Sequence, residues 1–174
     1  MKQKTIPWPF IRQHASLTWR DVLWGYEHQL LGWTDVVALA RDRIRSDSEQ
    51  LELELSCLGK EEATRVGEVL RQIAASEPQP TDQTANKWLY LTLAWTFDNI
   101  KLLVDPLGEV EAIYADFDYP PDIESFVRYM PPARDYDPTT HSREQNERRL
   151  IENWSNYLQA AEGKWKPENE KKSG

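Results

Sequence analysis

The 174-residue sequence has few of the residues on which many small active sites depend. It contains one cysteine, three histidines and seven glycines. Cys57 alone cannot form an intramolecular disulfide, which fits a reducing compartment. His14, His28 and His141 have no helical metal-binding spacing, and the HExxH, GxSxG, GxGxxG and GxxxxGK[ST] motifs are absent. We therefore predict no enzyme activity, no metal and no cofactor.

Long apolar runs are also missing. No segment approaches the roughly 18 consecutive apolar residues of a membrane-spanning helix. The first residues, MKQKTIPWPFIRQH, lack the continuous apolar centre of a signal peptide. These two features predict a soluble cytoplasmic protein.

Basic residues are outnumbered, with 21 Lys and Arg against 29 Asp and Glu, for a formal net charge of -8. Such a chain repels the phosphate backbone, and no basic stripe offsets that repulsion, so direct binding of nucleic acid is not expected. A basic protein is a permitted partner, although an acidic surface often serves solubility alone.

Apolar and aromatic residues are plentiful. Hydrophobic residues make up 40% of the chain and eight are Trp, which predicts a folded core. Their spacing follows a helical period in several segments, including 33–44, 60–76 and 142–162. We predict an all-α fold of about seven to eight helices, in a single domain over residues 1–166, with a flexible tail at 167–174.

The pattern Leu-x-Trp-x-Asp-Val occurs twice, from Leu17 and from Leu31. Thr18 and Gly32 suit the N-cap position, which would place Asp21 and Asp35 in the first helical turn. The pattern therefore predicts two consecutive helix starts. A ligand clamp made of Trp and Asp is the functional alternative.

The most apolar segment is 85–105, which follows a Pro-rich break at 76–84. Its apolar residues cover most of the helical circumference, so we predict a Trp-rich central helix. The core residues expected from it are Trp88, Leu91, Trp95, Ile100 and Leu103.

The stretch DPLGEVEAIYADFDYPPDIESFVRYMP, residues 105–131, carries acids between apolar and aromatic residues. We call it the acidic block. Pro106 is expected to begin one short helix, and Pro120-Pro121 to end it and begin the next. The next helix has an apolar stripe made of Ile123, Phe126, Val127 and Met130.

Metal binding and catalysis are poorly matched to the acidic block. An EF-hand loop needs a central glycine, whereas Pro120 and Pro121 stand in the middle here. Paired catalytic carboxylates need a cleft that separates their pKa values, and the block offers neither His nor Lys.

A partner-binding surface remains, with Tyr114, Phe117, Tyr119 and Tyr129 as amphipathic contacts among the acids. The alternative is a solvated acidic rim over a buried face.

Three segments together resemble an uncharacterised bacterial family, domain-of-unknown-function family 2247. They are LGWTDVV, KWLYLTLAWTFDN and the acidic block, in which YADFDYP…FVRYMP is most specific. The resemblance extends from about Leu17 to Pro131, and leaves out the loop 131–141 and the last helix. It implies a small acidic protein of the type that often accompanies polymorphic toxin genes, some of which are immunity proteins.

Composition and resemblance together lead to the hypothesis of a stoichiometric protein-binding module, most plausibly an immunity-type inhibitor of a basic toxin domain. The alternative is a small enzyme or ligand-binding protein with a pocket of Trp and carboxylate residues, joining Asp98 or Asp116 to His28 or His141. The residues predicted to bind the partner are Glu109, Glu111, Asp116, Asp118, Tyr119, Asp122 and Glu124.

Overall fold

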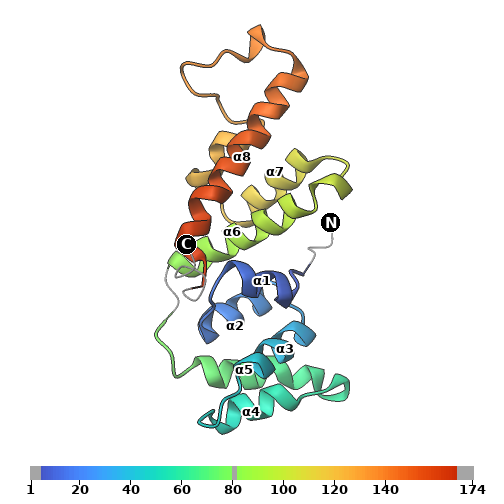
Figure 1. Ribbon diagram of the computed structural model, residues 1–174, viewed down its shortest axis with the longest axis vertical. Coiled ribbons are helices and arrows are strands. Elements are labelled where there is room, and N and C mark those ends of the chain that lie inside the picture. Colours follow the sequence, from blue (N-terminus) through green and yellow to red (C-terminus); the bar gives the residue numbers. More distant parts are fainter. Residues whose placement is uncertain (1–4, 80–81, 168–174) are drawn as a thin grey trace. The chain divides into compact units, whose positions relative to one another are not determined.

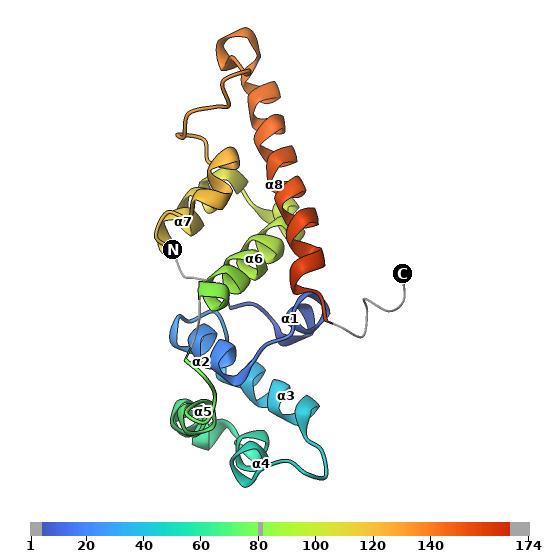
Figure 2. The ribbon, with the colours of Figure 1, turned by 90° about the vertical axis from the view of Figure 1, so that its left-hand side faces the viewer.

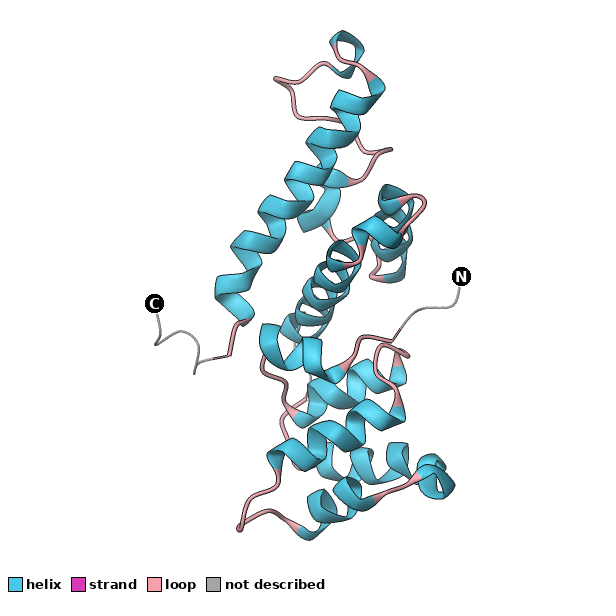
Figure 3. Ribbon diagram, turned by 45° about the vertical axis from the view of Figure 1, so that its right-hand side comes forward, coloured by secondary structure: helices cyan, strands magenta, loops and turns pink. Residues whose placement is uncertain are grey.

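The computed structural model describes residues 5–79 and 82–167 (Figure 1). In this part of the chain all regular structure is helical, with eight α-helices, four 3-10 helices and no strand (Figure 3). The all-α prediction is confirmed. Contacts group the chain into two compact units, Met1–Trp88 with Lys166–Gly174, and Leu89–Trp165. The predicted tail lies outside the described residues, except for Pro167.

The first unit packs short amphipathic helices on a core of aliphatic and Trp side chains. α2 contacts α5, and α3 contacts α4. Its elements are α1 (Trp8–His14), α2 (Trp19–Glu27), α3 (Trp33–Arg43), α4 (Gln50–Cys57), η1 (Lys60–Arg65), α5 (Val66–Ala74) and the beginning of α6 (Asp82–Asp98).

The two predicted helix starts are both present. Thr18 caps α2, accepting a hydrogen bond from the Asp21 N–H while the Asp21 carboxylate accepts one from the Thr18 N–H. Gly32 is the N-cap of α3, and Asp35 lies in its first turn. Asp35 also accepts a hydrogen bond from the Trp8 N–H at 2.9 Å. The repeated pattern therefore marks helix starts.

α2 approaches α6 closely at a glycine. A Cβ atom added to Gly25 would lie 2.2 Å from the ring of Trp88, which is fully buried. The Trp88 indole N–H donates to the carbonyl oxygen of Asp21 at 2.9 Å. Gly25 is thus required for the fit of the Trp88 side chain against α2.

The second unit is built around α6 and α8 (Figure 2). The Trp154 ring is fully buried, edge-on to Phe97 at 5.0 Å and stacked with Phe126 at 6.3 Å between centroids. Besides the rest of α6, the elements are η2 (Ile100–Leu102), α7 (Pro106–Asp116), η3 (Pro121–Phe126), η4 (Pro138–Thr140) and α8 (Arg143–Trp165).

The central helix is shorter than the segment 85–105 predicted for it. α6 ends at Asp98, where the Asn99 side chain donates to the carbonyl oxygen of Trp95 at 2.8 Å and so competes with the helical bonds. The chain then continues as η2, and Leu102 and Val104 are among the most exposed apolar residues described.

The early end of α6 also affects how deeply the predicted core residues are buried. Trp88 and Leu91 are fully buried, whereas Trp95, Ile100 and Leu103 are half-buried.

The segment after Pro120 forms a 3-10 helix rather than the expected longer helix. Even so, Ile123, Phe126 and Val127 are buried, as their spacing predicted. None of the helices in residues 5–79 and 82–167 has the length and apolar character needed to cross a bilayer.

Candidate functional site

The acidic block turns sharply where α7 ends. The Tyr119 N–H donates to the carbonyl oxygen of Tyr114 at 2.8 Å, and the Asp118 N–H to that of Ala115 at 3.1 Å. This is the Schellman arrangement that closes many helices, usually with glycine at the left-handed position. Here Asp118 takes the place of that glycine, with φ of 60°, and the next residue, Tyr119, is also left-handed, with φ of 57°. Two successive hydrogen-bonded left-handed residues give the turn a defined shape.

The seven residues predicted to bind a partner fall into two groups. Four are exposed and occupy the end of α7, the turn and η3: Asp116, Asp118, Tyr119 and Asp122. The other three, Glu109, Glu111 and Glu124, are half-buried.

The carboxylates of Asp116, Asp118 and Asp122 are exposed and have no hydrogen bond or ion pair with any described residue, whereas that of Glu109, equally unpaired among these residues, is half-buried. Asp116 and Asp118 also lie at the C-terminal end of α7, where the helix dipole disfavours negative charge. These two acids therefore do not stabilise the helix that carries them.

Glu111 is engaged within the chain by Arg128, which also binds Asp105. The Arg128 guanidinium donates to Glu111 at 2.7 and 3.2 Å and to Asp105 at 3.0 and 2.9 Å. Hydrogen bonds to Glu111 and Asp105 raise the pKa of Arg128, and the Arg128 hydrogen bonds hold the pKa of Asp105 below its usual value. No sequence pattern predicted this arrangement, although Arg128 is the block's only basic residue.

Three tyrosines gather beside the turn, and we call them the tyrosine cluster: Tyr114, Tyr119 and Tyr129. Tyr114 is buried, and its ring is edge-on to Tyr119 at 5.2 Å and tilted against Tyr129 at 6.0 Å between centroids. Tyr119 and Tyr129 are 56% and 59% exposed. The cluster therefore presents two aromatic side chains to solvent on a buried base.

The electrostatic surroundings of the cluster are negative. The Tyr114 hydroxyl donates to the Glu124 carboxylate at 3.1 Å. Desolvation and then that hydrogen bond raise the pKa of Tyr114. Desolvation, Tyr119 and Glu111 raise the pKa of Tyr129. Among these causes, the Glu124 and Glu111 carboxylates place negative charge near the cluster.

The inner face of the acidic block belongs to the core of the second unit, with Tyr114 and Phe126 buried and Phe117 half-buried. Burial thus matches the alternative of a solvated rim for these residues. It does not extend to Tyr119 and Tyr129, which remain exposed.

The second unit also has a groove of about 510 Å³ beneath the loop 131–142. It is lined by prolines, by Tyr136 and by charged residues that include Arg143 and Glu147. The loop is fixed to α8 because the Tyr136 hydroxyl donates to Asn146 and its ring lies under Arg149 at 3.8 Å. A further hollow of about 490 Å³ lies on α8, beside Phe97 of α6.

These hollows do not have the composition expected for the alternative pocket. No Trp lines either of them, and neither do Asp98, Asp116, His28 or His141. The two histidines instead stack on Trp24 and Tyr136. Within residues 5–79 and 82–167, no group of three His, Cys, Asp or Glu side chains is placed to hold a metal.

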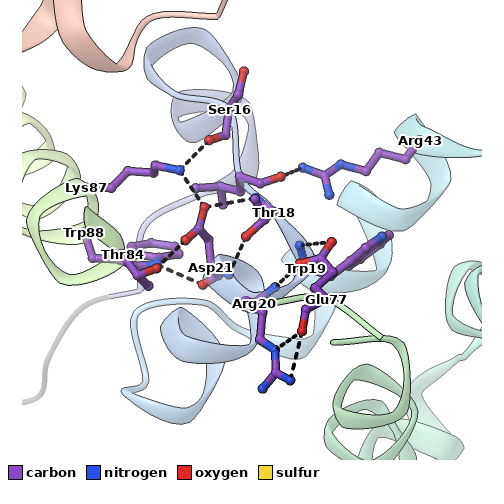
Figure 4. A network of polar contacts seen from close by, with 11 residues as sticks. Ser16, Thr18, Trp19, Arg20, Asp21, Arg43, Glu77, Thr84, Lys87 and Trp88 are labelled. Carbon is purple, nitrogen blue, oxygen red and sulfur yellow. Dashed lines mark hydrogen bonds and ion pairs between the residues drawn. The ribbon is translucent and has the colours of Figure 1, made fainter. Parts of the chain in front are cut away.

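Asp21 illustrates an acid with a structural role in the first unit (Figure 4). It is 3% exposed, and its carboxylate accepts hydrogen bonds from Thr18, Thr84 and Lys87 at 2.9, 2.8 and 2.5 Å. Burial acts to raise the pKa of Asp21, but the bonds from Lys87, Thr18 and Thr84 outweigh it and the pKa lies below its usual value.

Other side chains extend this network around the start of α2. The Glu77 carboxylate accepts hydrogen bonds from the backbone N–H groups of Trp19 and Arg20 at 3.2 and 2.9 Å. Arg43 donates to the carbonyl oxygen of Leu17. The sequence predicted the N-cap at Thr18 with Asp21 in the first turn, but not these partners from distant segments.

Comparison with protein families gives one finding. The family model described as "Uncharacterized protein conserved in bacteria (DUF2247)" matches residues 9–162. The resemblance inferred from sequence is confirmed, and the match also takes in the loop 131–141 and most of α8. No curated protein and no solved structure matches the chain.

Proposed function

The chain belongs to the bacterial family DUF2247, and we propose that it acts by stoichiometric binding of a basic protein, as an immunity-type protein binds its cognate toxin. The supporting observation is the turn after α7. The end of α7, this turn and η3 display three exposed carboxylates, unpaired among the described residues, beside two exposed tyrosines, and hydrogen bonds fix the backbone of the turn. We propose the cytoplasm as its compartment, because the single exposed thiol of Cys57 remains reduced there.

Charge supports this function at long range. A net charge of -8 attracts a basic protein and raises the rate of encounter, an effect that falls with ionic strength. Asp116 and Asp118 add local charge at a helix end that would be more stable without it. Their position is therefore better explained by binding than by folding.

At short range the tyrosines supply contact area. Exposed Tyr side chains are frequent anchors in interfaces because they bury a large surface with few rotatable bonds. The Schellman turn and the paired Arg128 limit the motion of the segment that carries them. A surface ordered before binding loses less conformational entropy in the complex.

The test compares capture of partners from the bacterium that encodes the protein, using tagged wild type and a charge variant. Asp116→Lys suits the last turn of α7, and Asp118→Asn keeps a residue that tolerates the left-handed region. We expect the variant to bind the basic partner at least tenfold more weakly, with an unchanged circular dichroism spectrum.

A matched control makes the same charge changes in the first unit. Glu61 and Glu62 are adjacent, exposed acids in η1, so Glu61→Lys with Glu62→Asn alters the net charge equally. We expect this control to keep most of the affinity. Equal losses of affinity in the two variants would show that only the net charge matters for binding. Unchanged affinity in both would refute the proposed surface.

The groove beneath the loop 131–142 lacks the predicted Trp and Asp residues, but its volume of about 510 Å³ offers a place to test for a small ligand. If no protein is captured under conditions in which candidate toxins are expressed, small-molecule screening by thermal shift addresses that alternative. A stabilising ligand lost with Tyr136→Ala would then favour it over the binding of a protein.

A further inference from the structure

We infer that the tyrosine cluster, made of Tyr114, Tyr119 and Tyr129, is a binding site for one arginine side chain of the basic partner. This inference deepens the proposed function by naming the chemistry that the surface recognises. It rests on that function for the source of the arginine, while the capacity to bind a guanidinium group is a property of the cluster itself.

Aromatic geometry is the first support. A cation is attracted to the face of an aromatic ring when it lies within about 6 Å of the centroid. The Tyr119 and Tyr129 rings each lie against the buried Tyr114 ring, at 5.2 and 6.0 Å between centroids, so the two exposed rings share one aromatic base. The two outer rings are more than half exposed and accessible from solvent.

The second support is the negative potential around the rings. The Glu124 carboxylate accepts a hydrogen bond from the Tyr114 hydroxyl at the base of the cluster. Glu111 and Tyr119 both raise the pKa of Tyr129, which places them electrostatically close to it. The carboxylate of Asp118, directly before Tyr119, is exposed and unpaired among the described residues. Carboxylates near an aromatic face strengthen the attraction for a cation.

The nearest basic residue of the chain does not satisfy this site. Arg128 precedes Tyr129, but its guanidinium is held by Asp105 and Glu111 through four hydrogen bonds. The cation–π contacts seen in the described part of the chain involve other aromatic residues: Trp19, Tyr136 and Trp165.

Backbone geometry is the third support. Tyr119 is fixed at φ 57° by the hydrogen bond from its N–H to Tyr114, and its ring packs against the Tyr114 ring. The cluster is therefore assembled before a ligand arrives. We favour arginine over lysine because the planar guanidinium group stacks on aromatic rings while its N–H groups bind carboxylates.

The test uses nuclear magnetic resonance of the full chain, with labelled tyrosine rings, titrated with the blocked peptide acetyl-Gly-Arg-Gly-amide. The control peptide replaces Arg by citrulline, which has nearly the same shape and no charge. We expect saturable shifts of the Tyr119 and Tyr129 rings with the Arg peptide only. Equal shifts with both peptides, or shifts confined to other residues, would overturn the inference.

Variants separate ring faces from hydroxyl groups. Tyr119→Phe with Tyr129→Phe keeps both aromatic faces and should bind the Arg peptide within about twofold of wild type. Tyr119→Leu with Tyr129→Leu removes them and should weaken binding by about two- to fivefold per ring. Retained affinity in the Leu variant would contradict the inference. If that variant unfolds, the two single Leu variants are compared with the Phe variant.

The two proposals fail in different ways. In the first case, a basic protein is captured by wild type and by the Leu variants, but is lost on changing Asp116 and Asp118. That result would refute the arginine site and support the proposed function. Selective binding of the Arg peptide, without capture of any basic protein, would support the arginine site and count against the immunity-type function.

Discussion

Asp21 in the first unit and Asp116 in the second are acids at opposite ends of their helices. Asp21 lies in the first turn of α2, where the helix dipole favours a negative charge, and it is buried with three hydrogen-bond donors around it. Asp116 lies in the last turn of α7, where the dipole disfavours it, and its exposed carboxylate is unpaired among the described residues. The first acid stabilises its unit, and the second lowers the stability of its helix.

This difference separates a carboxylate that stabilises the fold from one that the proposed binding function would use. A buried carboxylate contributes only when its donors are in place, because burial without them is strongly unfavourable. An exposed carboxylate at an unfavourable helix end stabilises little, but its charge remains available to a partner. Similar residues thus point to opposite roles once burial and partners are known.

The largest expected effect comes from breaking the network around Asp21. Asp21→Asn removes the ion pair with Lys87, whose side chain is 13% exposed, and should lower the free energy of unfolding by about 3 kcal/mol. Asp116→Asn should instead leave it unchanged or raise it by a few tenths of a kcal/mol. Hydrogen exchange of amides in α2 and α7 measures the two units separately. Similar losses in both variants would contradict the comparison.

Glycine substitutions sharpen the comparison next. Gly25→Ala brings a methyl group into the Trp88 ring and should destabilise the first unit by about 1–3 kcal/mol. In α8, a Cβ at Gly163 meets no atom within 4 Å, so Gly163→Ala should stabilise by about 0.5–1 kcal/mol. Urea unfolding of both variants measures the difference. A neutral Gly25→Ala would show that Trp88 can move aside.

Extremes of pH should act on different units. The lowered pKa of Asp21 contributes stability to the first unit above about pH 3.8, and that stability is lost as the pH falls through the lower folded value. In the second unit, burial and then Glu162 raise the pKa of Tyr90 to about 12. The resulting stability is present below about pH 10 and is lost as the pH rises towards 12.

Stability profiles of three proteins test this pH dependence. We expect Asp21→Asn to flatten the acid side, and Tyr90→Phe to flatten the alkaline side by up to about 2 kcal/mol. The pKa of Tyr157 is also raised by burial, so Tyr157→Phe should act in the same direction as Tyr90→Phe. Alkaline unfolding that is unchanged in both Phe variants would contradict the assignment.

The smallest effects concern the two Schellman turns. Gln29 closes α2 with φ 61°, as Asp118 closes α7 with φ 60°. Gln29→Gly should stabilise the first unit by up to about 1 kcal/mol, because Gln is poorly suited to the left-handed region. Asp118→Gly should gain less, since Asp tolerates that region better. Thermal unfolding measures both, and a loss of stability in either would argue against strain at that residue.

Much of the fold was accessible from the spacing of apolar residues and from caps. The starts of α2 and α3 followed from Thr18, Gly32 and the acids three residues later. The helical period over 142–162 matches α8, whose Trp154 is fully buried. It did not predict the end of α6 at Asp98, because the apolar periodicity continues past that residue, whereas the Asn99 side chain and backbone N–H both donate to the carbonyl oxygen of Trp95 there.

The candidate site was predicted as a stretch of sequence, without its internal contacts. Glu111 and Glu124 were grouped with the other acids, yet one binds Arg128 and the other accepts a hydrogen bond from Tyr114. Tyr129 was predicted to be a contact residue, but its packing against the Tyr114 ring was not predicted. Such pairings bring together residues 10–23 positions apart, and no local pattern encodes them.

The sequence by itself determined the all-α class, the helix starts, the negative charge and the family, since these depend on local spacing, composition and motif. Only the tertiary structure decided which acids are buried, paired or exposed, because burial and ion pairing depend on segments that meet after folding. That decision separates Asp21, which stabilises the first unit, from Asp116 and Asp118, whose charges remain available for binding.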